Sequence, residues 1–84
     1  MKNMESVTYK VVIEPLEEGR FGVEVPALPG CITWGRTYED AVAMAKEAIE
    51  AYLLSLLKHN QRIPVEKTET PVTLGISVRV PAHA

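Results

Sequence analysis

The residues best suited to chemistry gather in one stretch, VPALPGCITWGRT, which covers residues 25–37. It holds the only cysteine and the only tryptophan of the chain, Cys31 and Trp34, together with two prolines and two glycines. A thiol becomes a good nucleophile when a neighbouring base or a helix N-terminus lowers its pKa. The two histidines, His59 and His83, lie far from Cys31 in the sequence. We therefore expect a packed thiol and no catalytic residue in this stretch.

The acidic side chains Glu14 and Glu24 offer a second kind of chemistry. They fall on the expected outer sides of two neighbouring strands, where a carboxylate pair could hold Mg²⁺ or exchange protons. We prefer the alternative that Glu17, Glu18 and Glu24 are solubilising charges, because exposed strands commonly carry such side chains. One cysteine and two distant histidines do not make a four-ligand metal set, and no phosphate-binding glycine loop occurs. The sequence predicts no catalytic, metal or cofactor site.

The composition limits the class of protein. A chain of 84 residues suits one domain, residues 1–84, and its 46% hydrophobic and 24% charged residues are typical of soluble globular proteins. The net charge of −2 disfavours direct binding to nucleic acid, which rewards a basic surplus. A single cysteine excludes an intrachain disulfide, and we find no signal-like or membrane-spanning segment. We expect a cytoplasmic protein without membrane association.

Alternating apolar and polar residues predict the strands. Residues 7–14 and 21–25 form an antiparallel hairpin with Gly19 in its turn. Prolines then end the second strand, and Gly30 permits the sharp turn into a short third strand over residues 31–36. The strongest strand signal is VTLGISVRV, residues 72–80. The inward side chains of the hairpin are expected to be Val7, Tyr9, Val11, Ile13, Phe21, Val23 and Val25.

A long amphipathic helix is predicted over residues 38–59. Thr37, followed three residues later by Asp40, is a variant of the capping box that opens helices. Apolar residues then recur at steps of three and four: Ala41, Ala45, Ala48, Ile49, Tyr52, Leu53, Leu56 and Leu57. The order β-β-β-α-β predicts a two-layer α+β fold, in which an antiparallel sheet of three N-terminal strands and one C-terminal strand carries one helix on one face.

A single helix covers only part of a four-stranded sheet, so apolar residues should remain at an edge or on the far face. We expect Tyr9, Leu28, Trp34 and Arg36 to form a partner-binding surface. Tryptophan and arginine are enriched at interface hot spots, although Trp34 could equally fill the core. Self-association into a homodimer or a higher homo-oligomer is the accompanying expectation.

Residues 9–64 together resemble the N-terminal domain of HicB-like antitoxins. The pattern is a hairpin that leads into V-P-x-L-P-G-C, a G-x-T helix start, an alanine- and glutamate-rich helix, and I-P after it. Its elements here are Val25, Pro26, Leu28, Pro29, Gly30 and Cys31, then Gly35 and Thr37, then Ala41, Ala45, Glu47 and Ala48, and finally Ile63 and Pro64. The resemblance implies a partial ribonuclease-H-like sheet. It also implies a partner, a HicA-like toxin that cleaves mRNA and whose active site the antitoxin masks.

Members of that family usually continue into a C-terminal DNA-binding domain, whereas only PAHA follows the last predicted strand. We therefore expect a stand-alone N-terminal-type domain that does not bind operator DNA by itself. The first functional hypothesis is neutralisation of a HicA-type toxin. The alternative is an oligomeric domain of the same fold that binds another protein or a small ligand without catalysis. A third, metal-dependent hydrolysis through Glu14 or Glu24, is the least favoured.

Overall fold

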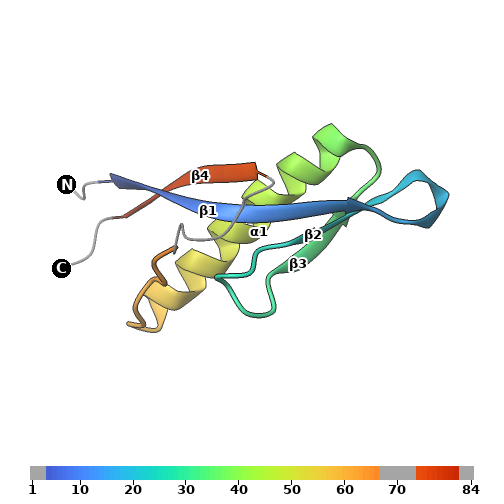
Figure 1. The fold of residues 1–84 in the computed structure, drawn as a ribbon. Helices are drawn as coiled ribbons and strands as arrows, with labels where there is room; N and C mark the ends of the chain where they lie inside the picture. Colours follow the sequence, from blue (N-terminus) through green and yellow to red (C-terminus); the bar gives the residue numbers. More distant parts are fainter. Residues whose placement is uncertain (1–3, 67–73, 82–84) are drawn as a thin grey trace.

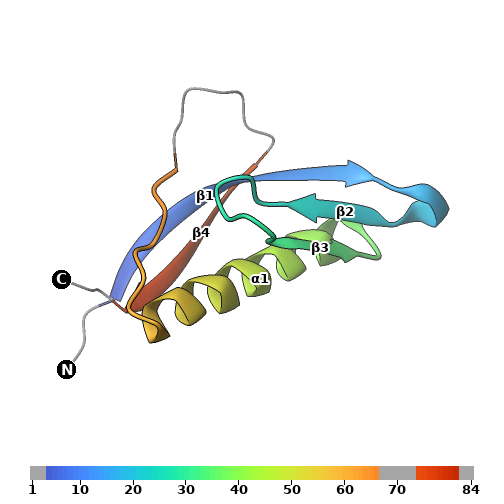
Figure 2. The ribbon, with the colours of Figure 1, turned by 90° about the horizontal axis from the view of Figure 1, so that it is seen from below.

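The structure is a computed structural model that describes residues 4–66 and 74–81. Within these residues the order is β1 (Met4–Pro15), a 3₁₀ turn η1 (Glu17–Gly19), β2 (Phe21–Glu24), β3 (Ile32–Gly35), α1 (Tyr38–Lys58) and β4 (Leu74–Pro81) (Figure 1). The strands form one antiparallel sheet in the order β3-β2-β1-β4. Helix α1 runs along one face of this sheet (Figure 2). The predicted α+β class and element order are confirmed.

Strand β1 is long enough to pair with two strands in succession. Its first part, from Met4 to Val11, pairs with β4, and its second part, from Val12 to Pro15, pairs with β2. Neighbouring residues in a strand point to opposite faces, so this register turns every second side chain of β1 and β4 toward α1. The far face receives the residues in between. One strand therefore joins the two halves of the sheet.

The start of α1 confirms the predicted cap. The Thr37 hydroxyl accepts a hydrogen bond from the Asp40 backbone N–H at 3.0 Å, and the Asp40 carboxylate accepts one from the Arg36 N–H at 2.9 Å. The returning bond thus reaches one residue further back than in the usual capping box. Gly35 precedes this cap, and a Cβ built there would lie 2.3 Å from the backbone nitrogen of Ala41. Only glycine lets the helix approach β3 so closely.

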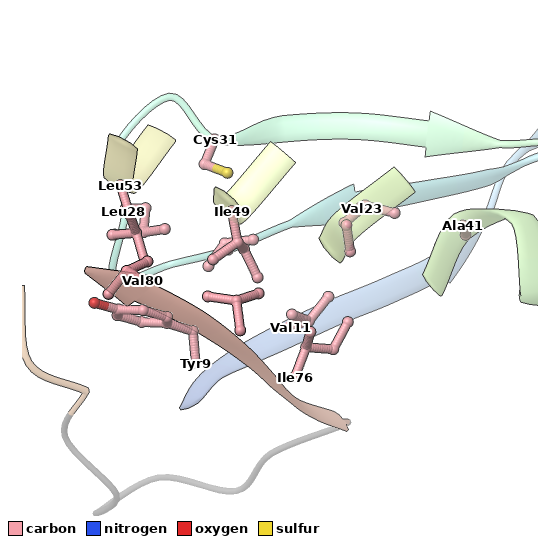
Figure 3. Close-up of a cluster of buried hydrophobic side chains, with 13 residues drawn as sticks. Tyr9, Val11, Val23, Leu28, Cys31, Ala41, Ile49, Leu53, Ile76 and Val80 are labelled. Carbon is pink, nitrogen blue, oxygen red and sulfur yellow. The ribbon is translucent and has the colours of Figure 1, made fainter. Parts of the chain in front are cut away.

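The core lies between the sheet and α1 and draws on β1, β2, β4, α1 and the loop between β2 and β3 (Figure 3). Its buried members are Tyr9, Val11, Val23, Val25, Leu28, Cys31, Ala41, Ala45, Ile49, Leu53, Ile76, Val78 and Val80. Tyr9 and Leu28, which were predicted to lie on a partner-binding surface, are 1% and 0% exposed. The prediction that these two residues remain accessible is therefore wrong.

Leu28 is buried because its loop folds back beneath the helix. The Leu28 N–H donates to the Val25 carbonyl at 2.9 Å, and the Cys31 N–H donates to the Leu28 carbonyl at 2.9 Å. The hydroxyl of Tyr52, a residue of α1, donates to the Pro29 carbonyl of the loop at 2.8 Å. The side chain of Leu28 points into the same cluster as Leu53 (Figure 3). The proline-rich stretch is thus a compact loop that closes one end of the core.

Tyr9 is covered by the chain that follows α1. Its hydroxyl donates to the carbonyl of Pro64, while the carboxylate of Glu66 accepts from the Lys10 backbone N–H at 2.8 Å. These bonds hold residues 64–66 against β1, in the part of the strand that does not pair with β2. Burial, reinforced by the nearby charge of Glu66, raises the pKa of Tyr9 above its ordinary value.

The ends of the elements differ from the predicted ones by a few residues. The first strand begins earlier than residue 7, and the third occupies Ile32–Gly35 within the predicted 31–36. Helix α1 ends at Lys58, so His59 is its C-cap, where the ring Nδ1 lies 2.8 Å from the Ser55 carbonyl. The predicted final strand is confirmed from Leu74 onward. Its first two residues, and His83, lie outside the described residues.

Candidate partner-binding face

The face of the sheet opposite α1 carries an apolar patch at its β3 end. We call Val12, Leu16, Gly22, Ile32 and Trp34 the outer-face patch. These residues line an open hollow of about 510 Å³. Ile32 is 69% exposed, and Leu16 and Trp34 are each 47% exposed. Large apolar side chains gathered in this way on a surface are typical of interaction sites.

The register of three strands assembles the patch. Trp34 on β3 is directly opposite Gly22 on β2, and Ile32 is opposite Glu24. Glu24 is in turn opposite Val12 on β1, so Ile32, Glu24 and Val12 form one row across the strands, next to the row that contains Trp34 and Gly22. Directly opposed residues share a face, so both rows cross the sheet on the side away from the helix. Gly22 has no side chain of its own, and the Leu16 side chain packs over this position.

The hairpin tip folds over this space and supplies two further side chains. The Leu16 N–H donates to the Arg20 carbonyl at 2.6 Å, which closes the turn between β1 and β2. A methyl carbon of Leu16 lies only 3.3 Å from where a Cβ on Gly22 would be. The Arg20 guanidinium lies 5.1 Å from the centre of the Trp34 ring, within the range of a cation–π contact.

Charged side chains surround the apolar centre. Glu14, Arg20 and Glu24 line the same hollow. Arg20 is also 3.5 Å from the Glu18 carboxylate, so its charge is partly balanced within the hairpin tip. The rim of the outer-face patch is therefore acidic on balance.

Trp34 and Arg36 are both exposed, so Trp34 does not fill the core, which was the alternative left open for it. A second hollow beside the first is lined by Trp34, Arg36, Thr37, Asp40 and Met44. Trp34 thus borders both hollows, whereas Arg36 belongs only to the second. Their role in binding a partner stays a prediction. Sequence reasoning missed Ile32 as a surface residue, although its position two residues before Trp34 places both on one face.

The catalytic alternatives gain no support from these positions. Glu14 is paired with Gly22, and Glu24 with Val12, so the two carboxylates are not directly opposed. Cys31 is buried, and this burial raises the pKa of its thiol, which is the opposite of what a nucleophile requires. Among residues 4–66 and 74–81, no three His, Cys, Asp or Glu side chains gather to hold a metal ion.

In the part of the chain that the structure describes, no helix combines the length and the apolar character needed to cross a bilayer.

Comparison with known proteins places this sheet and helix in a family. Residues 9–73 match the sequence profile described as HicB_like antitoxin of bacterial toxin-antitoxin system. The chain belongs to the HicB-like antitoxin family. This HicB-like chain is 51% identical over 61 residues to UPF0150 protein Ta0767 of Thermoplasma acidophilum. The aligned region covers 73% of the chain and 88% of that protein.

Two further comparisons concern proteins that are named as antitoxins. Antitoxin HicB 1 of Photorhabdus laumondii is 37% identical over 65 residues, which is 77% of the HicB-like chain but 40% of that longer protein. The crystal structure of the N-terminal domain of Burkholderia pseudomallei antitoxin HicB superposes with a TM-score of 0.67 at 19% identity. That match covers 93% of the chain and 100% of the solved domain, so the two share a fold.

Proposed function

We propose that this HicB-like chain is an antitoxin that binds a HicA-type, mRNA-cleaving toxin and inhibits it by covering its active site. The family supports the general role. The observation that supports the specific proposal is the outer-face patch, an exposed apolar surface with an acidic rim. A toxin that handles RNA must present basic groups to phosphates, and such a surface complements an acidic one. The chain acts by binding, without catalysis of its own.

The test is co-expression of the chain with a candidate toxin encoded next to its gene. We expect the toxin alone to stop growth and to lower the level of intact mRNA. With the chain present, growth should resume and the two proteins should purify together. Purified toxin should also stop cleaving RNA in vitro when the chain is added in equimolar amount. Growth arrest that persists despite abundant folded chain, with no co-purification, would rule out this function.

Homo-oligomerisation is a separate part of the proposal. The exposed apolar side chains of a chain this small favour contact with another protein chain, and a second copy is one such partner. We expect light scattering at micromolar concentration to report at least twice the chain mass of 9.3 kDa. A mass that stays at 9.3 kDa over that range would show a monomer.

A further inference from the structure

We propose that the outer-face patch binds arginine or lysine side chains of a basic partner protein, and that the partner's cation takes the place on Trp34 that Arg20 occupies in the free chain. The inference rests on the proposed function, in which the toxin is that partner. It adds the surface, the kind of side chain that is recognised, and an internal competitor.

The first step is the apolar centre. Ile32 and Trp34 stand out from β3 on the outer face, and the Leu16 side chain packs over Gly22, the residue opposite Trp34. Tryptophan is the side chain that most often dominates binding energy at protein interfaces, and its ring face attracts cations. A side chain that enters the hollow meets the Trp34 ring and the Leu16 side chain among its lining residues.

The second step is the charge around this centre, which decides between a basic partner and a second copy. Glu14 and Glu24 line the hollow, and Arg20 is the cation among its lining residues. Two copies joined through this face would bring acidic rims together, which costs energy unless every carboxylate finds a cation. A partner that presents arginine or lysine gains the cation–π contact and the attraction of both carboxylates.

The third step is the position of Arg20. Its guanidinium lies 5.1 Å from the Trp34 ring centre and 3.5 Å from Glu18, and its side chain is about half exposed. Exposed contacts of these two kinds are weak, so a partner can displace them at small cost. Arg20 therefore shows the geometry that an incoming cation would adopt. Removal of Arg20 should strengthen binding about threefold, because it removes both a competitor and a like charge.

The experiment uses two ligands with the full chain, a fluorescein-labelled hexa-arginine peptide and the candidate toxin. Peptide binding is followed by fluorescence anisotropy at low salt, and toxin binding by co-purification and calorimetry. The test variants are Trp34→Ala, Glu24→Gln and Arg20→Ala. The matched controls are Leu54→Ala, which removes a side chain that is 49% exposed on α1, and Glu47→Gln, which removes an exposed charge from the same helix. Circular dichroism checks that every variant is folded.

We expect Trp34→Ala to weaken both ligands about tenfold or more, as hot-spot residues do, and Glu24→Gln to weaken both by a smaller factor. Arg20→Ala should tighten both, and the two controls should stay within twofold of wild type. Equal peptide affinity for all variants would overturn the inference. Toxin binding that is unchanged by Trp34→Ala would also overturn it, while leaving the antitoxin role intact. Trp34-dependent peptide binding by a chain that ignores the toxin would refute only the antitoxin role.

Discussion

Substitution of Gly35 by alanine should be among the most damaging single changes in this chain. A Cβ at this position would lie 2.3 Å from the backbone nitrogen of Ala41, 2.6 Å from its Cα and 2.8 Å from the Asp40 carbonyl carbon. Ordinary contacts of this kind are about 1 Å longer, so the first turn of α1 must move away from β3. The obstacle is backbone, which cannot rotate out of the way as a side chain can.

The size of the effect follows from this overlap. Overpacking a well-packed site costs about 1–3 kcal/mol, and a collision with helix backbone belongs at the upper end of that range. The cap at Thr37 and Asp40 adjoins the displaced turn and would be strained with it. We expect a loss of about 3 kcal/mol, against a total stability of about 4–13 kcal/mol for a domain of this length.

Urea unfolding followed by circular dichroism measures this loss. With a slope of about 1 kcal/mol/M, typical of small domains, the midpoint should fall by about 3 M or the variant should be unfolded in buffer. Gly75→Ala is the matched control, since a Cβ there would meet only the Thr8 methyl group at 3.3 Å. Its midpoint should change by no more than about 0.5 M. Equal midpoints for the two variants would refute the close helix–strand contact.

Three further predictions address the cap, the loop and the buried titratable groups. Thr37→Ala removes the acceptor of the Asp40 N–H and should cost about 1 kcal/mol in urea unfolding, whereas an unchanged midpoint would refute the cap. Leu28→Ala removes a fully buried side chain and should lower the free energy of unfolding by about 2–5 kcal/mol. A decrease below about 0.5 kcal/mol would indicate that Leu28 lies on the surface. Burial raises the pKa values of Tyr9 and Cys31 above their ordinary values of 10.0 and 9.0. The stability that the neutral forms of these groups supply is therefore complete below those ordinary pKa values. It is lost as the pH rises through the raised pKa values of the folded protein. The double variant Tyr9→Phe/Cys31→Ala should lose less stability than wild type between pH 8 and 11, and parallel pH profiles would contradict this assignment.

The sheet and the helix could be predicted from the sequence because their signals are local. Period-2 alternation marked β1, β2 and β4, and apolar residues at steps of three and four marked α1. The cap was readable from Thr37 and Asp40 alone. In each case the residues that carry the signal are also the residues that make the contact.

The surface was harder to predict because exposure depends on segments that are distant in sequence. Alternation correctly placed Tyr9 among the inward side chains, but Pro64, which accepts the hydrogen bond of its hydroxyl, is 55 residues away and could not be identified from the sequence near Tyr9. Leu28 lies in a proline-rich loop, which is a sequence typical of the surface. The backbone hydrogen bonds of this loop hold it in a compact form in which the Leu28 side chain points into the core. The burial of Leu28 and the covering of the Tyr9 hydroxyl therefore depend on tertiary structure.

The same distinction explains why the candidate binding face was only half visible in the sequence. Alternation places Ile32 and Trp34 on one face of β3, but it does not say which face the helix covers. Gly35 determines which face the helix covers. Helix α1 approaches β3 so closely at this position that only glycine fits, so Gly35 lies on the side of β3 that faces the helix. Trp34 then points the other way. The glycine that admits the helix thus also turns the only tryptophan outward, so the closeness of the core contact and the exposure of the candidate binding face have one cause.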